Sequence, residues 1–132
     1  MDLSQFHFLI IDDDTFTCDL ILRMLSRNGA QQIESVNDGK EAVARIEAME
    51  KHPDIIICDL NMPEMDGIEF VHYLVQELYM GGIILISGSD RVILNAVKTL
   101  ASTHFLNVLG FLEKPFTPES LVTMLADFKK KE

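Results

Sequence analysis

Acidic, hydroxyl and ammonium side chains follow the apolar segments of this chain, each at the point where a segment ends. Asp59 ends one such segment, and Asp12 and Asp13 follow another. Ser87 and Lys114 hold the same position after two later segments. Carboxylates are preferred ligands of hard divalent cations, and a nearby ammonium can offset the charge of a transferred phosphoryl group. These residue types therefore indicate a site that holds a divalent metal and accepts a phosphoryl group.

Strand-like and helix-like segments alternate along the whole chain. Short apolar runs are followed by segments whose apolar residues recur at helical spacing, with Gly or Pro at several boundaries. Strands are expected at residues 6–12, 32–36, 54–59, 83–87 and 108–112, and helices at residues 15–28, 39–51, 68–78, 90–103 and from residue 118 onward. Such strand–helix units with right-handed crossovers predict an α/β fold, a parallel sheet with helices on both faces. The carboxyl ends of its strands meet in one crevice, where ligands bind.

Helical spacing also predicts which residues face the core. The pattern places Phe16, Leu20 and Met24, with their neighbours Ile21 and Leu25, at helical spacing in the first helix. It places Ile68, Val71, Val75 and Leu78 along one side of the third helix. Asp14, Asp38 and Thr117 precede helices and have side chains suited to N-caps. The helix at residues 90–103 carries more apolar residues than one face needs, which indicates either a partner surface or a deeper core.

The composition favours a single domain over residues 1–132. The chain has 132 residues, 48% of them apolar, and a net charge of −10, which argues against nucleic acid or an anionic membrane as a partner. Two cysteines without a Cys-x-x-Cys motif are typical of reduced core residues in a cytoplasmic protein. No apolar run approaches the ~20 residues of a membrane span, and the first residues lack the basic segment of a signal peptide.

Several short motifs follow the predicted strands in a particular order. They are Ile11-Asp12-Asp13, Asp59-Leu60-Asn61-Met62-Pro63 with Met65-Asp66-Gly67, Ser87-Gly88-Ser89, and Lys114-Pro115-Phe116. In this order the chain resembles, over nearly its whole length, the receiver domain of bacterial two-component response regulators. The resemblance implies a flavodoxin-like, doubly wound sheet of five parallel strands in the order 2-1-3-4-5 with five flanking helices.

The resemblance also implies a role for each acid of the crevice. Asp59 resembles the aspartate that takes a phosphoryl group from a histidine kinase or phosphotransfer protein in a phosphorelay. Asp12 and Asp13 resemble the acids that hold Mg²⁺, with the backbone carbonyl of Asn61 completing the protein ligands. We expect Asp13, Asp59 and the Asn61 carbonyl to bind the ion directly and Asp12 to act largely through water, since Mg²⁺ keeps several waters.

Three further residues correspond to the switch of such domains. Ser87 resembles the switch hydroxyl, Lys114 the ammonium that pairs with the phosphoryl oxygens, and Phe111 the switch aromatic, here without a phenol hydroxyl. The output surface is then the fourth helix, the fifth strand and the fifth helix, for an output domain, a protein partner or a second copy of the chain. The resemblance further implies a cis Lys114–Pro115 bond and a signalling domain rather than an enzyme, limited to self-phosphotransfer and self-dephosphorylation.

Two other functions are compatible with parts of the sequence. A haloacid-dehalogenase-like phosphatase would use Asp12 as nucleophile, but Phe16 stands where its motif wants Thr, and Asp59 would have no role. A receiver-like interaction module without phosphorylation would not need the complete set of acids, hydroxyl and lysine. The segment from Asn107 to Pro115 also resembles receivers joined to EAL-type cyclic di-GMP phosphodiesterase domains, which would make the chain a piece of a larger protein.

Overall fold

Strand and helix alternate along the chain as the sequence predicts. The structure, a computed structural model, describes residues 2–61, 67–88 and 91–130. The strands are β1 (His7–Ile11), β2 (Gln32–Val36), β3 (Ile55–Asp59), β4 (Gly82–Ser87) and β5 (Asn107–Glu113). The helices are α1 (Thr15–Arg27), α2 (Gly39–Glu47), α3 (Gly67–Gln76), α4 (Arg91–Thr103) and α5 (Pro118–Lys130). Among the described residues, no helix is long and apolar enough to cross a membrane.

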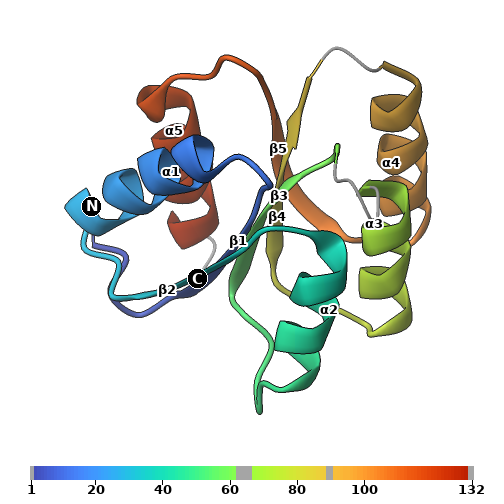
Figure 1. The fold of residues 1–132 in the computed structure, drawn as a ribbon, viewed down its shortest axis with the longest axis horizontal. Helices are drawn as coiled ribbons and strands as arrows, with labels where there is room; N and C mark the ends of the chain where they lie inside the picture. The colour runs from blue at the N-terminus through green and yellow to red at the C-terminus, as the bar shows by residue number, and fades with distance from the viewer. Residues whose placement is uncertain (1, 62–66, 89–90, 131–132) are drawn as a thin grey trace.

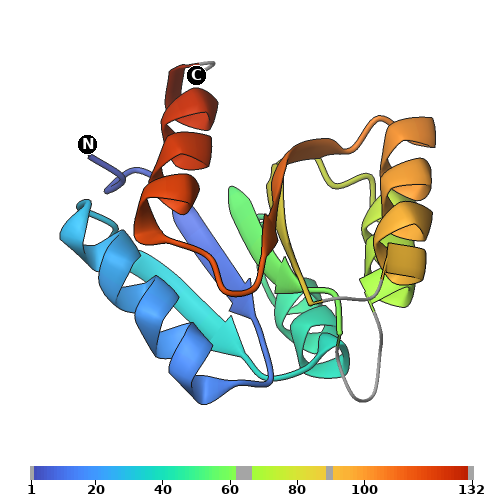
Figure 2. The same ribbon diagram turned by 90° about the horizontal axis from the view of Figure 1, so that it is seen from above.

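The strands form one parallel sheet in the order β2-β1-β3-β4-β5. This order confirms the predicted flavodoxin-like topology. Figure 1 shows α1 and α5 against one face of the sheet and α2, α3 and α4 against the other, and Figure 2 shows the same division from above. The central strand β3 is buried along its whole length, as its continuous apolar sequence predicts.

Two separate cores lie on the two faces of the sheet. Alternate residues of a strand point to opposite faces, so Phe8 and Ile10 of β1 pack with α1 and α5 in one core. Their neighbours Leu9 and Ile11 pack with α2, α3 and α4 in the other. Every one of these four side chains is fully buried. The sheet is thus covered on both faces, and its strand ends are held in register from both sides.

The predicted core faces of two helices are correct only in part. Ile21, Met24 and Leu25 of α1 are buried as predicted, whereas Phe16 is 75% exposed. Leu78 is 78% exposed and has a positive φ of 55°, since α3 ends at Gln76. Val71 is buried as predicted, together with Gly67, Phe70 and Leu74, and Ile68 packs against the same core.

The helix caps agree with the sequence. Asp14 accepts a hydrogen bond from the Phe16 N–H at the start of α1 (3.0 Å), and Asp38 accepts one from the Glu41 N–H at α2 (2.7 Å). Thr117 accepts one from the Ser120 N–H at α5 (3.3 Å). Each cap satisfies a backbone donor that the helix itself leaves unpaired. The caps therefore determine where three of the loops end.

Backbone hydrogen bonds extend past the carboxyl ends of the strands and position the loops that follow. The Leu60 N–H donates to the Ile86 carbonyl (2.9 Å), and the Lys114 N–H donates to the Ser87 carbonyl (3.0 Å). The Lys114–Pro115 bond is cis, as predicted. The predicted turn at residues 62–66 and the motif residue at position 89 lie outside the described residues.

Candidate functional site

Asp59 lies at the end of β3, in the middle of the crevice at the carboxyl edge of the sheet. Only 1% of this residue is exposed. Its Oδ1 accepts a hydrogen bond from the Asn61 N–H (3.0 Å), and its Oδ2 accepts one from the Lys114 ammonium (3.2 Å). A buried carboxylate is costly unless hydrogen bonds or opposite charge compensate it. The carboxylate of Asp59 has both kinds of compensation and is held in a fixed orientation.

Asp12 follows β1 beside Asp59 and is fully buried. Its Oδ1 accepts the Asp14 N–H (2.9 Å), whereas its buried Oδ2 accepts no hydrogen bond from any described residue. Burial raises the pKa of the Asp12 carboxyl to about 6, the charge of Asp59 adds to the rise, and the Asp14 N–H opposes it. The negative charge of Asp12 is therefore under-compensated in the protein alone.

Lys114 enters the crevice from the loop after β5 and lies close to both buried acids. Its Nζ lies 3.2 Å from Asp59 Oδ2 and 3.7 Å from Asp12 Oδ2. Partial burial by itself lowers the pKa of the Lys114 ammonium, but the charges of Asp59 and Asp12 outweigh it and leave the pKa above its usual value. The lysine therefore stays protonated and supplies one positive charge to the crevice.

The acids of the crevice form a group that fits a small divalent cation. Asp12, Asp13 and Asp59 each offer one carboxylate oxygen, and these oxygens lie within 4.8 Å of one another. Asp13 is exposed, so the group opens to water on one side. The buried Oδ2 of Asp12, which has no hydrogen-bond partner among the described residues, is one oxygen that a cation could compensate. A few carboxylates that are open to water suit Mg²⁺, because this ion keeps several water ligands. The arrangement thus fits the ion that the sequence predicts.

Ser87 ends β4 on the rim of the same crevice and is 5% exposed. Its carbonyl accepts the Lys114 N–H, so the hydroxyl residue and the lysine are tied together through the backbone. A Cβ added at Gly88 would lie 3.4 Å from the side-chain amide nitrogen of Asn61, which is an ordinary van der Waals distance. The structure therefore brings Ser87 and Asn61 to the crevice together with Asp12, Asp59 and Lys114, as the sequence predicts.

Phe111 lies on β5 opposite Leu85 of β4 and is half-buried. The ammonium of Lys98, on α4, lies 4.9 Å from the centre of the Phe111 ring. The sequence prediction missed Lys98. A signal was available, because Lys98 is the only charged residue between Arg91 and the end of α4. Phe111 itself lies outside the group of acids, at the side of the crevice that faces α4.

Comparisons with known proteins agree with this geometry. A family model described as the response regulator receiver domain matches residues 8–126. The cyclic di-GMP phosphodiesterase RocR of Pseudomonas aeruginosa is 32% identical over 126 residues, which cover 96% of this chain but only 32% of RocR. The chemotaxis protein CheY of Thermotoga maritima is 28% identical over 92% of this chain and 96% of its own length.

Solved structures give the same result. A response regulator from Colwellia psychrerythraea is 33% identical, with a TM-score of 0.77 over 96% of this chain and 98% of that one. The chemotaxis response regulator CheY4 of Vibrio cholerae is 29% identical, with a TM-score of 0.74 over 92% of this chain and 97% of that one. The fold, the order of the motifs and the family match agree over most of the chain. The chain therefore belongs to the response regulator receiver domain family.

Proposed function

We propose that Asp59 accepts a phosphoryl group from a phosphohistidine of a histidine kinase or phosphotransfer protein. The observation that carries the proposal is the Asp59 carboxylate itself, buried at the end of β3 and paired with Lys114 at 3.2 Å beside two further acids. A carboxylate oxygen of Asp59 attacks phosphorus, the bond from phosphorus to the imidazole nitrogen breaks, and the imidazole leaves with the electron pair. The product is an acyl phosphate on Asp59.

The residues around Asp59 lower the electrostatic barrier to this attack. A carboxylate and a phosphoryl dianion repel each other, so the reaction needs positive charge near the transferred oxygens. Lys114 provides an ammonium already directed at Asp59, and the Asn61 N–H holds the carboxylate in place. Mg²⁺, when bound, supplies further positive charge for the phosphoryl oxygens. The buried position of Asp59 strengthens each of these interactions because little water screens them.

We assign the metal ligands to Asp13, Asp59 and the backbone carbonyl of Asn61, with Asp12 acting largely through water. The close approach of the carboxylate oxygens supports this assignment. In titration calorimetry with MgCl₂, Asp13→Asn should lose most of the affinity of the natural protein. Asp19→Asn, an exposed acid on α1, is the matched control and should bind as the natural protein does. Equal affinity for both variants would remove Asp13 from the ligand set.

Mass spectrometry tests the phosphoacceptor directly. The protein is incubated with acetyl phosphate and MgCl₂, and the modified residue is mapped by peptide fragmentation. An adduct on Asp59 that disappears in Asp59→Asn supports the proposal. An adduct on Asp12 would instead indicate a phosphatase that uses the first acidic motif. A protein that forms no adduct in the presence of Mg²⁺ would be an interaction module without phosphorylation.

We further propose that phosphorylation at Asp59 moves Ser87 inward and Phe111 with it, and so changes the surface of α4, β5 and α5. An output domain, a separate protein or a second copy of the chain would bind that surface. The backbone link from Ser87 to Lys114 and the exposed Val92 on α4 (78%) support this route. Hydrogen exchange with and without beryllofluoride should change in residues 91–128. Changes confined to the loops of the crevice would refute it.

The similarity to RocR supports a proposal about the kind of output domain that this receiver domain controls. RocR is named as a cyclic di-GMP phosphodiesterase, and this chain spans about a third of it. We propose residues 1–132 as the receiver unit, and a cyclic di-GMP phosphodiesterase as its output. The test is hydrolysis of cyclic di-GMP by the longer protein that this proposal implies, with and without beryllofluoride.

We assign the domain to the cytoplasm, because Cys18 and Cys58 are buried free thiols, which suit a reducing compartment.

A further inference from the structure

A pocket of about 230 Å³ lies between the switch hydroxyl and the aromatic residue on β5. Ser87 lines it from β4, Phe111 and Glu113 from β5, and Arg91, Leu94 and Lys98 from α4. Leu85 pairs with Phe111 and Ser87 with Glu113, so these residues share one face of the sheet. An apolar cavity of about 150 Å³ already accommodates benzene. The pocket therefore has room for the Phe111 ring to move toward Ser87.

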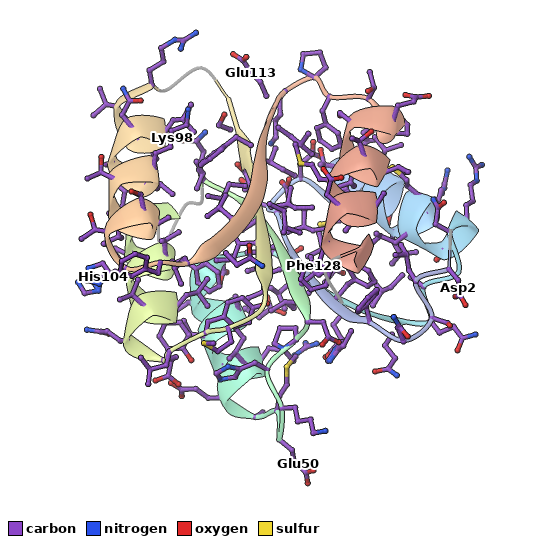
Figure 3. All side chains as sticks on the ribbon, turned by 180° about the vertical axis from the view of Figure 1, so that it is seen from behind. Asp2, Glu50, Lys98, His104, Glu113 and Phe128 are labelled. Carbon is purple, nitrogen blue, oxygen red and sulfur yellow. The ribbon has the colours of Figure 1, made fainter. Side chains whose placement is uncertain are left out.

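At the edge of this pocket the Phe111 ring packs against the core on the α4 side and has one identified polar contact with a described residue. Phenylalanine has no hydroxyl, so no hydrogen bond from its own side chain can fix its position. The Lys98 ammonium lies 4.9 Å from the ring centre, within the range of a cation–π interaction. Figure 3 shows Lys98 on α4 and Glu113 at the end of β5. The other charged residues that line the pocket are Arg91 and Glu113.

We propose that Lys98 is a positioning residue that holds the Phe111 ring outside the pocket and so opposes the switched state. This inference rests on the proposed function, because the switched state is the one that phosphorylation of Asp59 favours. Lys98 and Phe111 line the pocket from different elements. In the proposed movement the ring leaves the ammonium when it turns toward Ser87, so that the contact favours the resting state. A ligand that favours the switched state must overcome this difference. Removing the contact should therefore increase the affinity for such a ligand.

A double-mutant cycle with beryllofluoride and Mg²⁺, measured by titration calorimetry, tests this inference. The variants are Lys98→Met, Phe111→Leu and the double variant. A cation–π contact at an exposed site corresponds to an effect of about 2- to 5-fold on an equilibrium. Lys98→Met should therefore increase beryllofluoride affinity by about 2- to 5-fold more in the natural background than in the Phe111→Leu background. Loss of a positive charge affects anion binding equally in both backgrounds, so the cycle removes that contribution.

Two further variants separate the contact from charge in general. Lys98→Arg keeps a cation that can stack on the ring, and its affinity should match that of the natural protein. Lys51→Met removes an exposed lysine at the opposite edge of the sheet and should have no effect in either background. In NMR spectra of Lys98→Met without ligand, the Phe111 ring signals should shift toward their positions in the beryllofluoride complex. A merely structural role for Lys98 would not produce that shift.

The outcomes distinguish this inference from the proposed function. An equal effect of Lys98→Met in both backgrounds, with normal beryllofluoride binding by the natural protein, would overturn the role of Lys98 alone. A natural protein that binds no beryllofluoride would overturn the proposed function and this inference with it. Coupling of the expected size and direction, with Lys98→Arg behaving as the natural protein, would support both.

Discussion

Asp12→Asn should stabilise the protein in the absence of Mg²⁺. The substitution keeps the shape of the side chain and the acceptor for the Asp14 N–H, and it removes a buried negative charge. Lys114 loses its contact with Asp12 at 3.7 Å but keeps Asp59 at 3.2 Å. In the folded protein the pKa of Asp12 rises from 3.8 to about 6. The folded state therefore favours the uncharged form at this position, which asparagine mimics.

The size and the pH dependence of the effect follow from this pKa. A rise of about 2 units, at 1.36 kcal/mol per unit, corresponds to up to about 3 kcal/mol in the free energy of unfolding. The stability that Asp12 contributes is fully present below its unfolded pKa and is lost as the pH rises through the folded pKa of about 6. The two proteins should thus be equally stable below about pH 4 and differ most above about pH 7.

Urea unfolding in EDTA, at pH 4 and at pH 7.5, measures this difference. Asp19→Asn, an exposed acid on α1, is the matched control and should remain within about 0.5 kcal/mol of the natural protein. Saturating Mg²⁺ should stabilise the natural protein and narrow its difference from Asp12→Asn, because the ion compensates the same charge. If Asp12→Asn is no more stable than the natural protein at pH 7.5 in EDTA, the crevice is not strained by its acids and this reasoning is wrong.

Three other predictions concern the scaffold of the fold, each measured by urea unfolding. Asp14→Ala should cost about 1 kcal/mol through loss of the α1 cap, and an unchanged stability would mean that water replaces the cap. Tyr79→Phe should cost about 1–2 kcal/mol, because the buried hydroxyl donates to the Pro53 carbonyl at 2.9 Å; a neutral result would contradict that bond. Gly67→Ala should cost about 1–3 kcal/mol, because its Cβ would lie 2.8 Å from Leu60 backbone atoms, and a folded, equally stable variant would rule out this close approach.

The resemblance to receiver domains predicts the strand order, whereas the meeting of the site residues at one edge follows from the parallel sheet. Once Asp12, Asp59, Ser87 and Lys114 each follow a strand of a parallel sheet, the sheet itself brings them to one edge. No knowledge of side-chain packing is needed for that step. The burial of Asp59 and its distance to Lys114 needed the structure, because they depend on how the loops close.

Helix orientation is the part that the sequence predicts poorly. The apolar residues of α1 spread around more than half of the helix, so that periodicity alone does not choose between the face with Phe16 and the face with Ile21. The position of Lys98 as a lone charge along α4 was visible in the sequence, but its contact with Phe111 was not, since that depends on which side of α4 turns toward β5. Packing against the sheet decides both, and packing is a property of the whole fold.

The position of β5 at the rim of the sheet has a consequence for how partners can sense this domain. β5 pairs with β4 only, and the helices that flank it, α4 and α5, belong to the two different cores. A protein that binds across this rim touches both halves of the interior at once, without needing a route through the sheet. A protein that binds one broad face meets a single half. This rim is therefore a place on the surface where a movement of one core relative to the other can be detected, a property that it shares with the opposite rim at β2, flanked by α1 and α2.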